Sequence, residues 1–181
     1  VLLLEATSVE NIFSHIHTLG RIFDRSTEAH AMTAAMRSRM AEISSRTAHL
    51  PRIRVLYVIN SQPLITVGPG SYIHQMIGLA GGTNIASGAA TAYPRLTMET
   101  VLKEDPEVLI FPIGSVETVP RREQQEWRCL TTLTAVQQNR LREVSANALN
   151  RPGPRVMEGL EELVRVIHPE AFPPESVPVQ P

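Results

Sequence analysis

Beyond residue 52 the chain alternates between short β-branched runs and segments with helical spacing, and this alternation restricts the fold more than any other feature. Apolar runs of strand length cover residues 52–59, 108–111 and 141–144. Helical patterns cover residues 71–80, 97–102, 120–127 and 154–168. This order predicts an α/β fold of about 120 residues, a small open sandwich with a parallel sheet and right-handed crossovers.

In open sheets of this kind, ligands bind beyond the carboxyl ends of the strands. Those ends correspond to residues 61–70, 112–119 and 145–153, and each is rich in Gly, Pro, Asn or Ser. We expect irregular loops there, and a rim loop at residues 83–94. From composition alone, a binding face and plain connecting loops explain these stretches equally well.

A long helix precedes the alternating part, at residues 26–50. Its apolar positions follow one another in steps of four and three: Met32, Met36, Met40, Ile43, Thr47 and Leu50. Ser26 or Thr27 can cap its start, and Pro51 prevents its continuation. A helix of this length spans about 35 Å. Because its apolar stripe is narrow, we expect a rigid connecting helix that packs against another part of the protein along one face.

The first 25 residues predict a strand followed by a helix. Residues 1–4 form an apolar run typical of a buried strand that has lost its sheet, so we expect that a longer N-terminal part has been truncated. A capping box at residues 7–10 predicts a helix to Phe23, with Ile12, Phe13, Ile16, Leu19 and Phe23 buried. His15 and His17 project from different sides of that helix, which argues against a shared metal site and favours solvated side chains.

Composition excludes several classes of function. Net charge is −1 and 43% of residues are hydrophobic, which argues against nucleic-acid or anionic-lipid binding. The single cysteine, Cys129, excludes an internal disulfide and is expected to be a packing residue. No apolar run reaches 18 residues.

Catalytic motifs are missing from the sequence. Residues 68–71 (GPGS) follow a strand and precede a helix but lack the dinucleotide fingerprint and the P-loop lysine. Neither a nucleophile elbow nor a metal-spaced His/Glu set is present, so we expect no enzyme. Trp127 is expected to anchor the core, and His74 to be a surface side chain.

Several stretches together resemble the ABC-transporter solute-binding proteins of the helical-backbone type, which capture corrinoids such as vitamin B12, ferric siderophores and haem. They are residues 63–68 (PLITVG), 79–85 (LAGGTNI), 93–99 (YPRLTME), 106–110 (PEVLI), Trp127 with 133–136 (LTAV), and 151–155 (RPGPR). Their order and spacing carry the resemblance over nearly the whole chain.

The resemblance implies a division of the chain. Residues 1–25 would end a missing N-terminal lobe, 26–50 would be the backbone helix, 51–171 the C-terminal α/β lobe, and 172–181 a disordered Pro-rich tail. It also implies a periplasmic or lipid-anchored location and an ABC permease as membrane partner. We further expect the exposed N-terminal region to cause self-association.

The resemblance also implies the site. Ligand-facing positions correspond to Ile65, Tyr93 and the loop containing Asn147, Asn150 and Arg151. An apolar wall with a few polar groups suits a corrinoid or iron chelate, which would be transported rather than held as a permanent cofactor.

One further position is implied outside the ligand wall. Glu99 corresponds to the carboxylate that docks on permease arginines. Asn147 and Asn150 stand where corrinoid binders often carry acidic residues, which leaves siderophore and haem open as ligands. Two functions of other classes stay open as well: a ligand-free interaction module and a small α/β enzyme.

Overall fold

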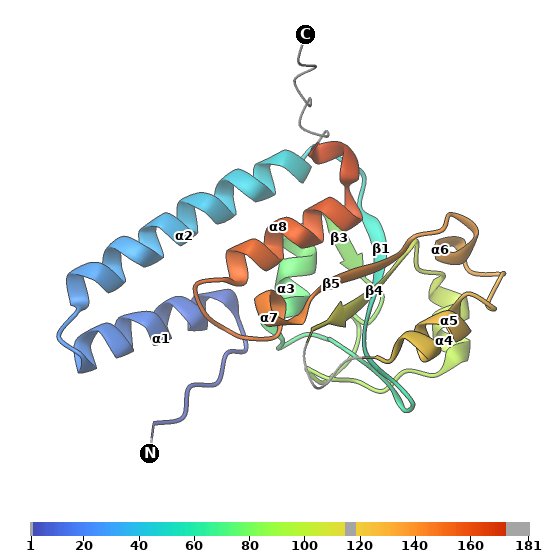
Figure 1. Ribbon diagram of the computed structural model, residues 1–181, viewed down its shortest axis with the longest axis horizontal. Coiled ribbons are helices and arrows are strands. Elements are labelled where there is room, and N and C mark those ends of the chain that lie inside the picture. Colours follow the sequence, from blue (N-terminus) through green and yellow to red (C-terminus); the bar gives the residue numbers. More distant parts are fainter. Residues whose placement is uncertain (1, 115–118, 173–181) are drawn as a thin grey trace, which may run out of the picture.

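An open sheet forms the centre of the molecule, with helices on both of its faces (Figure 1). The computed structural model describes residues 2–114 and 119–172, and within them the sheet has five strands. They are β1 (Ile53–Ser61), β2 (Leu64–Thr66), β3 (Gly82–Asn84), β4 (Val108–Ile113) and β5 (Leu141–Ser145). The order is β2-β1-β4-β5, and β3 also pairs with β1.

The sheet is mixed, which corrects the expectation of a purely parallel one. Strand β1 runs parallel to β3 and β4, and β4 runs parallel to β5. Strand β2 instead folds back and pairs antiparallel with β1. The three-residue strands β2 and β3 lie in stretches that we expected to be loops, because so few residues display no readable alternation.

Alternate residues of β1 divide the core between two layers. Val55 and Tyr57 face α1 (Val9–Ile22), α2 (Ser26–Thr47), α3 (Tyr72–Leu79) and α8 (Val156–Ile167). Leu56 and Val58 belong to the second cluster, with α4 (Met98–Glu104), α5 (Arg121–Trp127) and α6 (Thr134–Gln137). This period of two is the geometry of a strand covered on both faces. The predicted interior strand is confirmed in β4, whose residues 108–112 are all buried.

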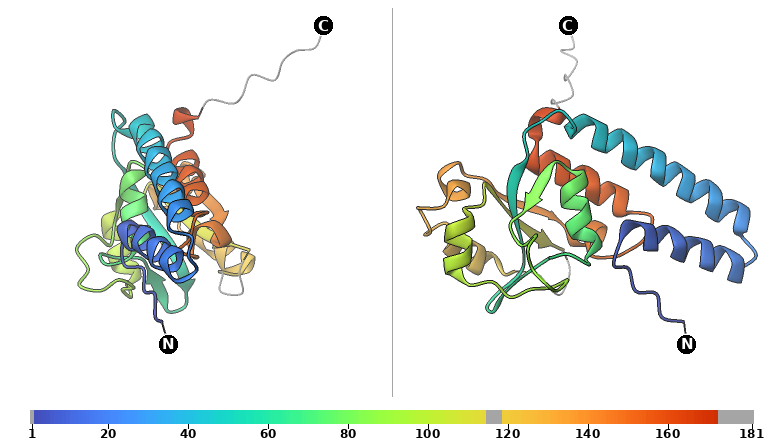
Figure 2. Two further views of the ribbon diagram at one scale, coloured as in Figure 1. Left: turned by 90° about the vertical axis from the view of Figure 1, so that its left-hand side faces the viewer. Right: turned by 180° about the vertical axis from the view of Figure 1, so that it is seen from behind.

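The predicted long helix is confirmed in α2, which has 22 residues and so spans about 33 Å. It ends at Thr47, three residues earlier than expected, and its N-cap is Arg25 without a side-chain hydrogen bond, so the expected serine or threonine cap was wrong. Met36 and Ile43 are buried along its seam, whereas Met32 is 44% exposed. Figure 2 shows α2 lying along α8, with its other end extending past the sheet beside α1. No helix in the described part of the chain combines the length and apolarity needed to cross a bilayer.

Charged side chains join α2 to the last helix. Arg39 of α2 binds Glu161 of α8, and Glu161 also binds Arg165. The ring of Phe172 lies under two guanidinium groups, that of Arg46 at 4.5 Å and that of Arg165 at 5.1 Å. Phe172 is therefore packed against the core, which corrects the expected start of a disordered tail; residues 173–181 lie outside the described residues.

The N-terminal strand prediction was wrong for the residues that the structure describes. Residues 2–4 have no strand structure, and Leu3 is 84% exposed. A strand needs a neighbour for its backbone hydrogen bonds, and no described strand lies beside this segment. Val1 lies outside the described residues.

Helix α1 is confirmed, with a different cap and a smaller buried face. Ser8 is the N-cap and accepts a hydrogen bond from the backbone N–H of Asn11. Leu19 and Phe23 are exposed because this end of the helix lies beyond the sheet (Figure 1).

The remaining elements both confirm and correct the sequence predictions. The helix predicted over residues 71–80 is confirmed in α3, which begins after the N-cap Ser71 and is followed by Gly81 with a φ of +81°. Trp127 is a core residue, and its ring meets that of Phe111 edge to face at 6.2 Å.

The segment expected to be irregular at 145–153 contains α7 (Ala146–Leu149), and Cys129 is exposed, so its predicted packing role was wrong. The 3-10 helix η1 (Pro169–Ala171) follows α8.

Candidate functional site

A cavity of about 410 Å³ opens at the carboxyl end of β1. Its walls come from the N-terminal segment, β1, the start of α3, the loop before α4 and the loop before α8. The lining residues are Leu4, Glu5, Ala6, Thr7, Ile59, Gly70, Tyr72, Ile73, Ala92, Tyr93, Asn150 and Pro152. Most are apolar, and a few polar groups lie among them, which is the composition of a small-molecule site.

The loop that carries Tyr93 packs closely against the backbone of Gly68, which has no side chain. The Gly68 N–H donates to the carbonyl of Ala92 at 2.8 Å. A Cβ at Gly68 would lie 2.5 Å from the backbone oxygen of Thr91, so any larger residue would displace the loop. The Tyr93 side chain is 56% exposed, which leaves its ring free to be covered by a ligand.

The buried Tyr57 orients the Asn150 side chain through a hydrogen bond. The Tyr57 hydroxyl donates to the Asn150 Oδ1 at 2.9 Å, across 93 residues of sequence. Burial raises the pKa of Tyr57 well above its usual value, so the hydroxyl stays protonated and remains a donor. The Asn150 side chain is half-buried, and its amide nitrogen has no hydrogen-bond partner among the described residues. Asn150 can therefore donate a hydrogen bond into the cavity.

A second tyrosine fixes the wall between α3 and α7. The Tyr72 hydroxyl donates to the carbonyl of Leu149 at 2.6 Å. Burial raises the pKa of Tyr72, and the neighbouring Tyr93 raises it further. The hydrogen bond holds the loop that carries Asn150 against the first turn of α3.

The structure brings together two of the five predicted ligand residues, Tyr93 and Asn150. The other three do not line the cavity. Ile65 is half-buried in β2 and forms a backbone bridge with Arg95. The Asn147 amide donates to the carbonyl of Gly114 at 3.0 Å, and Arg151 is exposed beside the lining residue Pro152.

Sequence reasoning missed several lining residues. Tyr72 falls inside the helical pattern of residues 71–80 and carries no site motif of its own, and Glu5 and Thr7 belong to a segment whose place beside β1 no local pattern reveals. One signal could have identified Tyr72 as a site residue. It directly follows a helix cap at a strand's carboxyl end, where ligands bind in such sheets.

Glu99 lies on a different surface. It is exposed in the first turn of α4, which Thr97 caps through its hydroxyl. The flanking side chains of Met98 and Leu102 are 39% and 46% exposed. Glu99 is not among the lining residues of the cavity.

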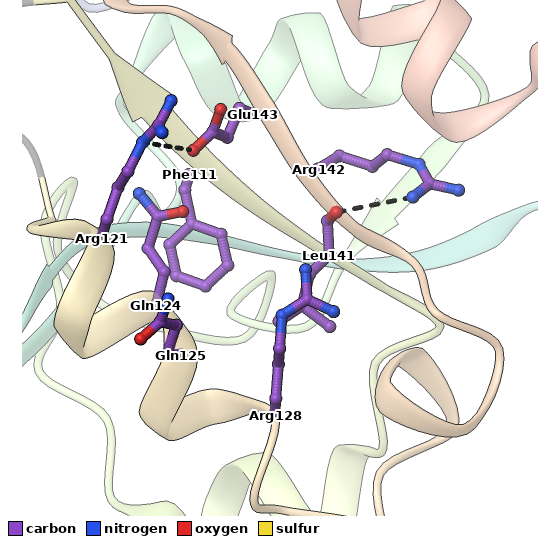
Figure 3. Close-up of a pocket in the computed structure, with 8 residues that line it drawn as sticks. All are labelled: Phe111, Arg121, Gln124, Gln125, Arg128, Leu141, Arg142 and Glu143. Atoms are coloured by element: carbon purple, nitrogen blue, oxygen red, sulfur yellow. Dashed lines mark hydrogen bonds and ion pairs between the residues drawn. The ribbon is translucent and has the colours of Figure 1, made fainter.

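A second hollow of about 410 Å³ lies between α5 and β5 (Figure 3). Arginines and glutamines from one face of α5 surround the Phe111 ring there. Glu143 offsets part of this positive charge, with its Oε1 4.0 Å from the Nε of Arg121, and Arg128 donates to the Asn139 side chain. This hollow lies on the flank of the sheet and contains none of the predicted site residues.

His74 is part of the framework, which corrects its assignment as a surface side chain. It is half-buried, and the Asn84 amide nitrogen lies 3.0 Å from its Nδ1 and 2.7 Å from the carbonyl of Val67. Because an amide nitrogen only donates, Nδ1 is the acceptor. Burial lowers the pKa of His74 and keeps the ring neutral.

The sequence matches a family model over most of its length. Residues 1–148 match the family described as periplasmic binding protein, and the chain belongs to this family. It is 28% identical over 169 residues to a cobalamin-binding protein of Halobacterium salinarum, covering 90% of this chain and 45% of that protein. It is 28% identical over 128 residues to a vitamin B12-binding protein of Vibrio cholerae, covering 70% of this chain and 45% of that protein. The chain thus spans about half the length of these curated relatives.

Solved structures share the fold. A possible iron-binding, periplasmic solute-binding protein of Staphylococcus epidermidis superposes with a TM-score of 0.81 at 21% identity, over 93% of this chain and 66% of that one. An ABC-type Fe3+-hydroxamate transport system protein of Saccharomonospora viridis gives 0.75 at 25% identity, over 91% and 57%. The predicted α/β binding-protein fold is confirmed, and the family is one of solute-binding proteins rather than enzymes.

Proposed function

We propose that this chain forms one wall of the ligand site in the substrate-binding component of an ABC importer, and that the ligand is a corrinoid. The observation that carries the proposal is the cavity at the carboxyl end of β1, where Tyr93 presents an exposed ring and Asn150 an oriented amide. A corrin is wide and partly apolar, so binding it requires a large desolvated face and a few hydrogen bonds that fix its orientation.

The relatives support this choice. The curated proteins of Halobacterium salinarum and Vibrio cholerae that match the chain are named for binding cobalamin and vitamin B12. A ferric siderophore is the second candidate, which the 25% identity to the Fe3+-hydroxamate transport protein favours. Haem, the third ligand implied by the resemblance, is included in the test below.

The same proposal assigns a role to each segment of the chain. Helix α2, from Ser26 to Thr47, acts as the backbone helix and residues 51–171 form the C-terminal lobe, while residues 1–25 belong to the end of an N-terminal lobe that supplies the opposite wall. The proposed location is the periplasm or the outer face of the membrane. The family description supports it, as does a Bacillus subtilis relative, 23% identical over 172 residues, that is named as an ABC transporter substrate-binding lipoprotein.

Exposed apolar side chains support the presence of such a neighbour. Leu3 is 84% exposed, Ile22 57% and Phe23 70%. In the longer protein we place the other lobe over these side chains, which lie at the two ends of α1, and in the isolated chain we expect copies to associate through them. Light scattering over a wide concentration range tests this: a strictly monomeric chain would contradict it.

Glu99 is the proposed contact with the membrane permease. It is exposed, and Met98 and Leu102 beside it add apolar area that a partner could cover. A carboxylate beside apolar side chains suits a partner surface that carries arginine.

Calorimetric titration of the full-length protein with cyanocobalamin, a ferric hydroxamate and haem tests the ligand assignment. Tyr93→Ala should weaken cyanocobalamin binding by about 2 kcal/mol, or roughly 30-fold, because it removes an aromatic ring covered on binding. Asn150→Ala should also weaken it, because the change removes the amide that Tyr57 orients at the cavity.

Glu99→Ala is the matched control, with unchanged ligand affinity but reduced uptake through the permease. Unchanged affinity in both Tyr93→Ala and Asn150→Ala would refute the site. Normal uptake by Glu99→Ala would refute the docking role.

A further inference from the structure

Two histidines from neighbouring helices meet at the α1–α2 hairpin, whose two helices lie side by side in Figure 1. The ring centroids of His17, in α1, and His30, in α2, are 4.4 Å apart, with 39° between the ring planes. The spacing of His15 and His17 excluded a site within one helix, but the antiparallel packing of α1 and α2 supplies the second imidazole from elsewhere in the sequence.

Hydrogen bonding determines which nitrogen of His17 is free. The Thr33 hydroxyl is buried and lies 3.0 Å from the Ala29 carbonyl and 3.1 Å from the His30 carbonyl. The His17 Nε2 lies 2.7 Å from the same hydroxyl and forms a hydrogen bond with it. Nδ1 is therefore the ring nitrogen of His17 that has no hydrogen-bond partner among the described residues.

The spacing of the rings fits a shared metal ion. With a metal–nitrogen distance of about 2.0 Å and a ring centroid roughly 1.1 Å beyond the nitrogen, two imidazoles at right angles on one metal have centroids about 4.4 Å apart. A tetrahedral angle would require about 5.1 Å by the same geometry. The observed centroid distance of 4.4 Å is close enough for both rings to reach one metal ion, and imidazole nitrogen is a ligand that suits Cu²⁺ and Ni²⁺.

We infer that His17 and His30 form a binding site for a divalent cation of tetragonal preference, Cu²⁺ first and then Ni²⁺. Thr33 acts as the orienting partner, because a metal-bound histidine typically donates its other N–H to a fixed acceptor. The described residues contain no group of three or more His, Cys, Asp or Glu side chains able to hold a metal, so water or an external donor completes the coordination. Arg21, one turn from His17, is exposed and can turn away from the ion.

Calorimetry on the 181-residue chain, prepared without a histidine tag, tests the inference with CuCl₂ and NiCl₂ at a pH of about 7.5. His30→Ala should lower the Cu²⁺ affinity by about 100-fold, because the two ligands no longer act together. His17→Ala should have the same effect. Thr33→Val, which keeps the side-chain shape, should lower it by about 10-fold or more.

His15→Ala and His49→Ala are the matched controls, since neither side chain belongs to the pair. Both should keep wild-type Cu²⁺ affinity, and circular dichroism confirms that each variant is folded. His30 is exposed, so His30→Ala tests the site even if His17→Ala disturbs the hairpin. Unchanged affinity in His30→Ala, or an equal loss in His49→Ala, would overturn the inference.

Discussion

Replacing Gly68 with alanine should displace the loop that carries Tyr93. The new Cβ would lie 2.5 Å from the Thr91 carbonyl oxygen and 3.0 Å from the Pro94 Cδ. The oxygen must move by about 0.8 Å to restore a carbon–oxygen contact of roughly 3.3 Å. That shift strains the hydrogen bond from the Gly68 N–H to the Ala92 carbonyl.

The magnitude follows from two destabilising effects and one that partly offsets them. Overpacking of this kind costs about 1–3 kcal/mol, and a weakened hydrogen bond adds about 0.5–1.5 kcal/mol. The lower chain entropy of alanine in the unfolded state offsets about 0.4–1 kcal/mol. A net loss of about 2 kcal/mol should lower the melting temperature by about 4–8 °C for a chain of this size.

Differential scanning calorimetry of Gly68→Ala beside Gly88→Ala measures this effect. No heavy atom lies within 4 Å of a Cβ at Gly88, so that variant shows what the glycine-to-alanine change does without a steric contact. In the full-length protein, Gly68→Ala should also weaken cyanocobalamin binding. Equal melting temperatures for the two variants would refute the packing argument.

Three further changes test separate contacts. Phe172→Ala should lower the free energy of unfolding by about 1–2 kcal/mol, because the ring lies against two guanidinium groups; chemical denaturation measures it, and an unchanged midpoint would show that the contact is not stabilising. Tyr57→Phe should cost about 1 kcal/mol and release Asn150, and a variant with full stability and full ligand affinity would contradict the orienting role. Because the pKa of His74 is lowered from 6.5 in the folded state, the unfolded state binds more protons, so stability should fall as pH drops below about 6.5. His74→Gln should reduce that fall in a pH series of melting curves, and parallel curves would count against it.

Local sequence signals predicted the elements whose cause is local. Helix α8 follows from the strict spacing of its apolar residues, α3 from Ser71 and Gly81 at its two ends, and β4 from an uninterrupted apolar run. Each depends on side-chain periodicity, capping or backbone conformation within about a dozen residues, which a sequence displays directly. The same signals failed for β2 and β3, because three residues are too few to show a period.

The candidate site depended on contacts between residues distant in sequence. Tyr93 was found through its motif. The residue that orients Asn150 is Tyr57, however, which is 93 positions away. Glu5 lines the cavity only because the N-terminal segment passes beside β1. A sequence does not display such distances.

The sequence by itself determined the α/β class, the long helix and the family resemblance, because periodicity and motif order are properties of the chain. The tertiary structure alone decided that residues 2–4 form no strand, that Cys129 is exposed, and that His17 lies beside His30. In each of these cases the deciding factor is the presence or absence of a neighbour brought in by packing. A strand requires a partner, burial requires a covering layer, and a two-histidine site requires a second helix at the right distance.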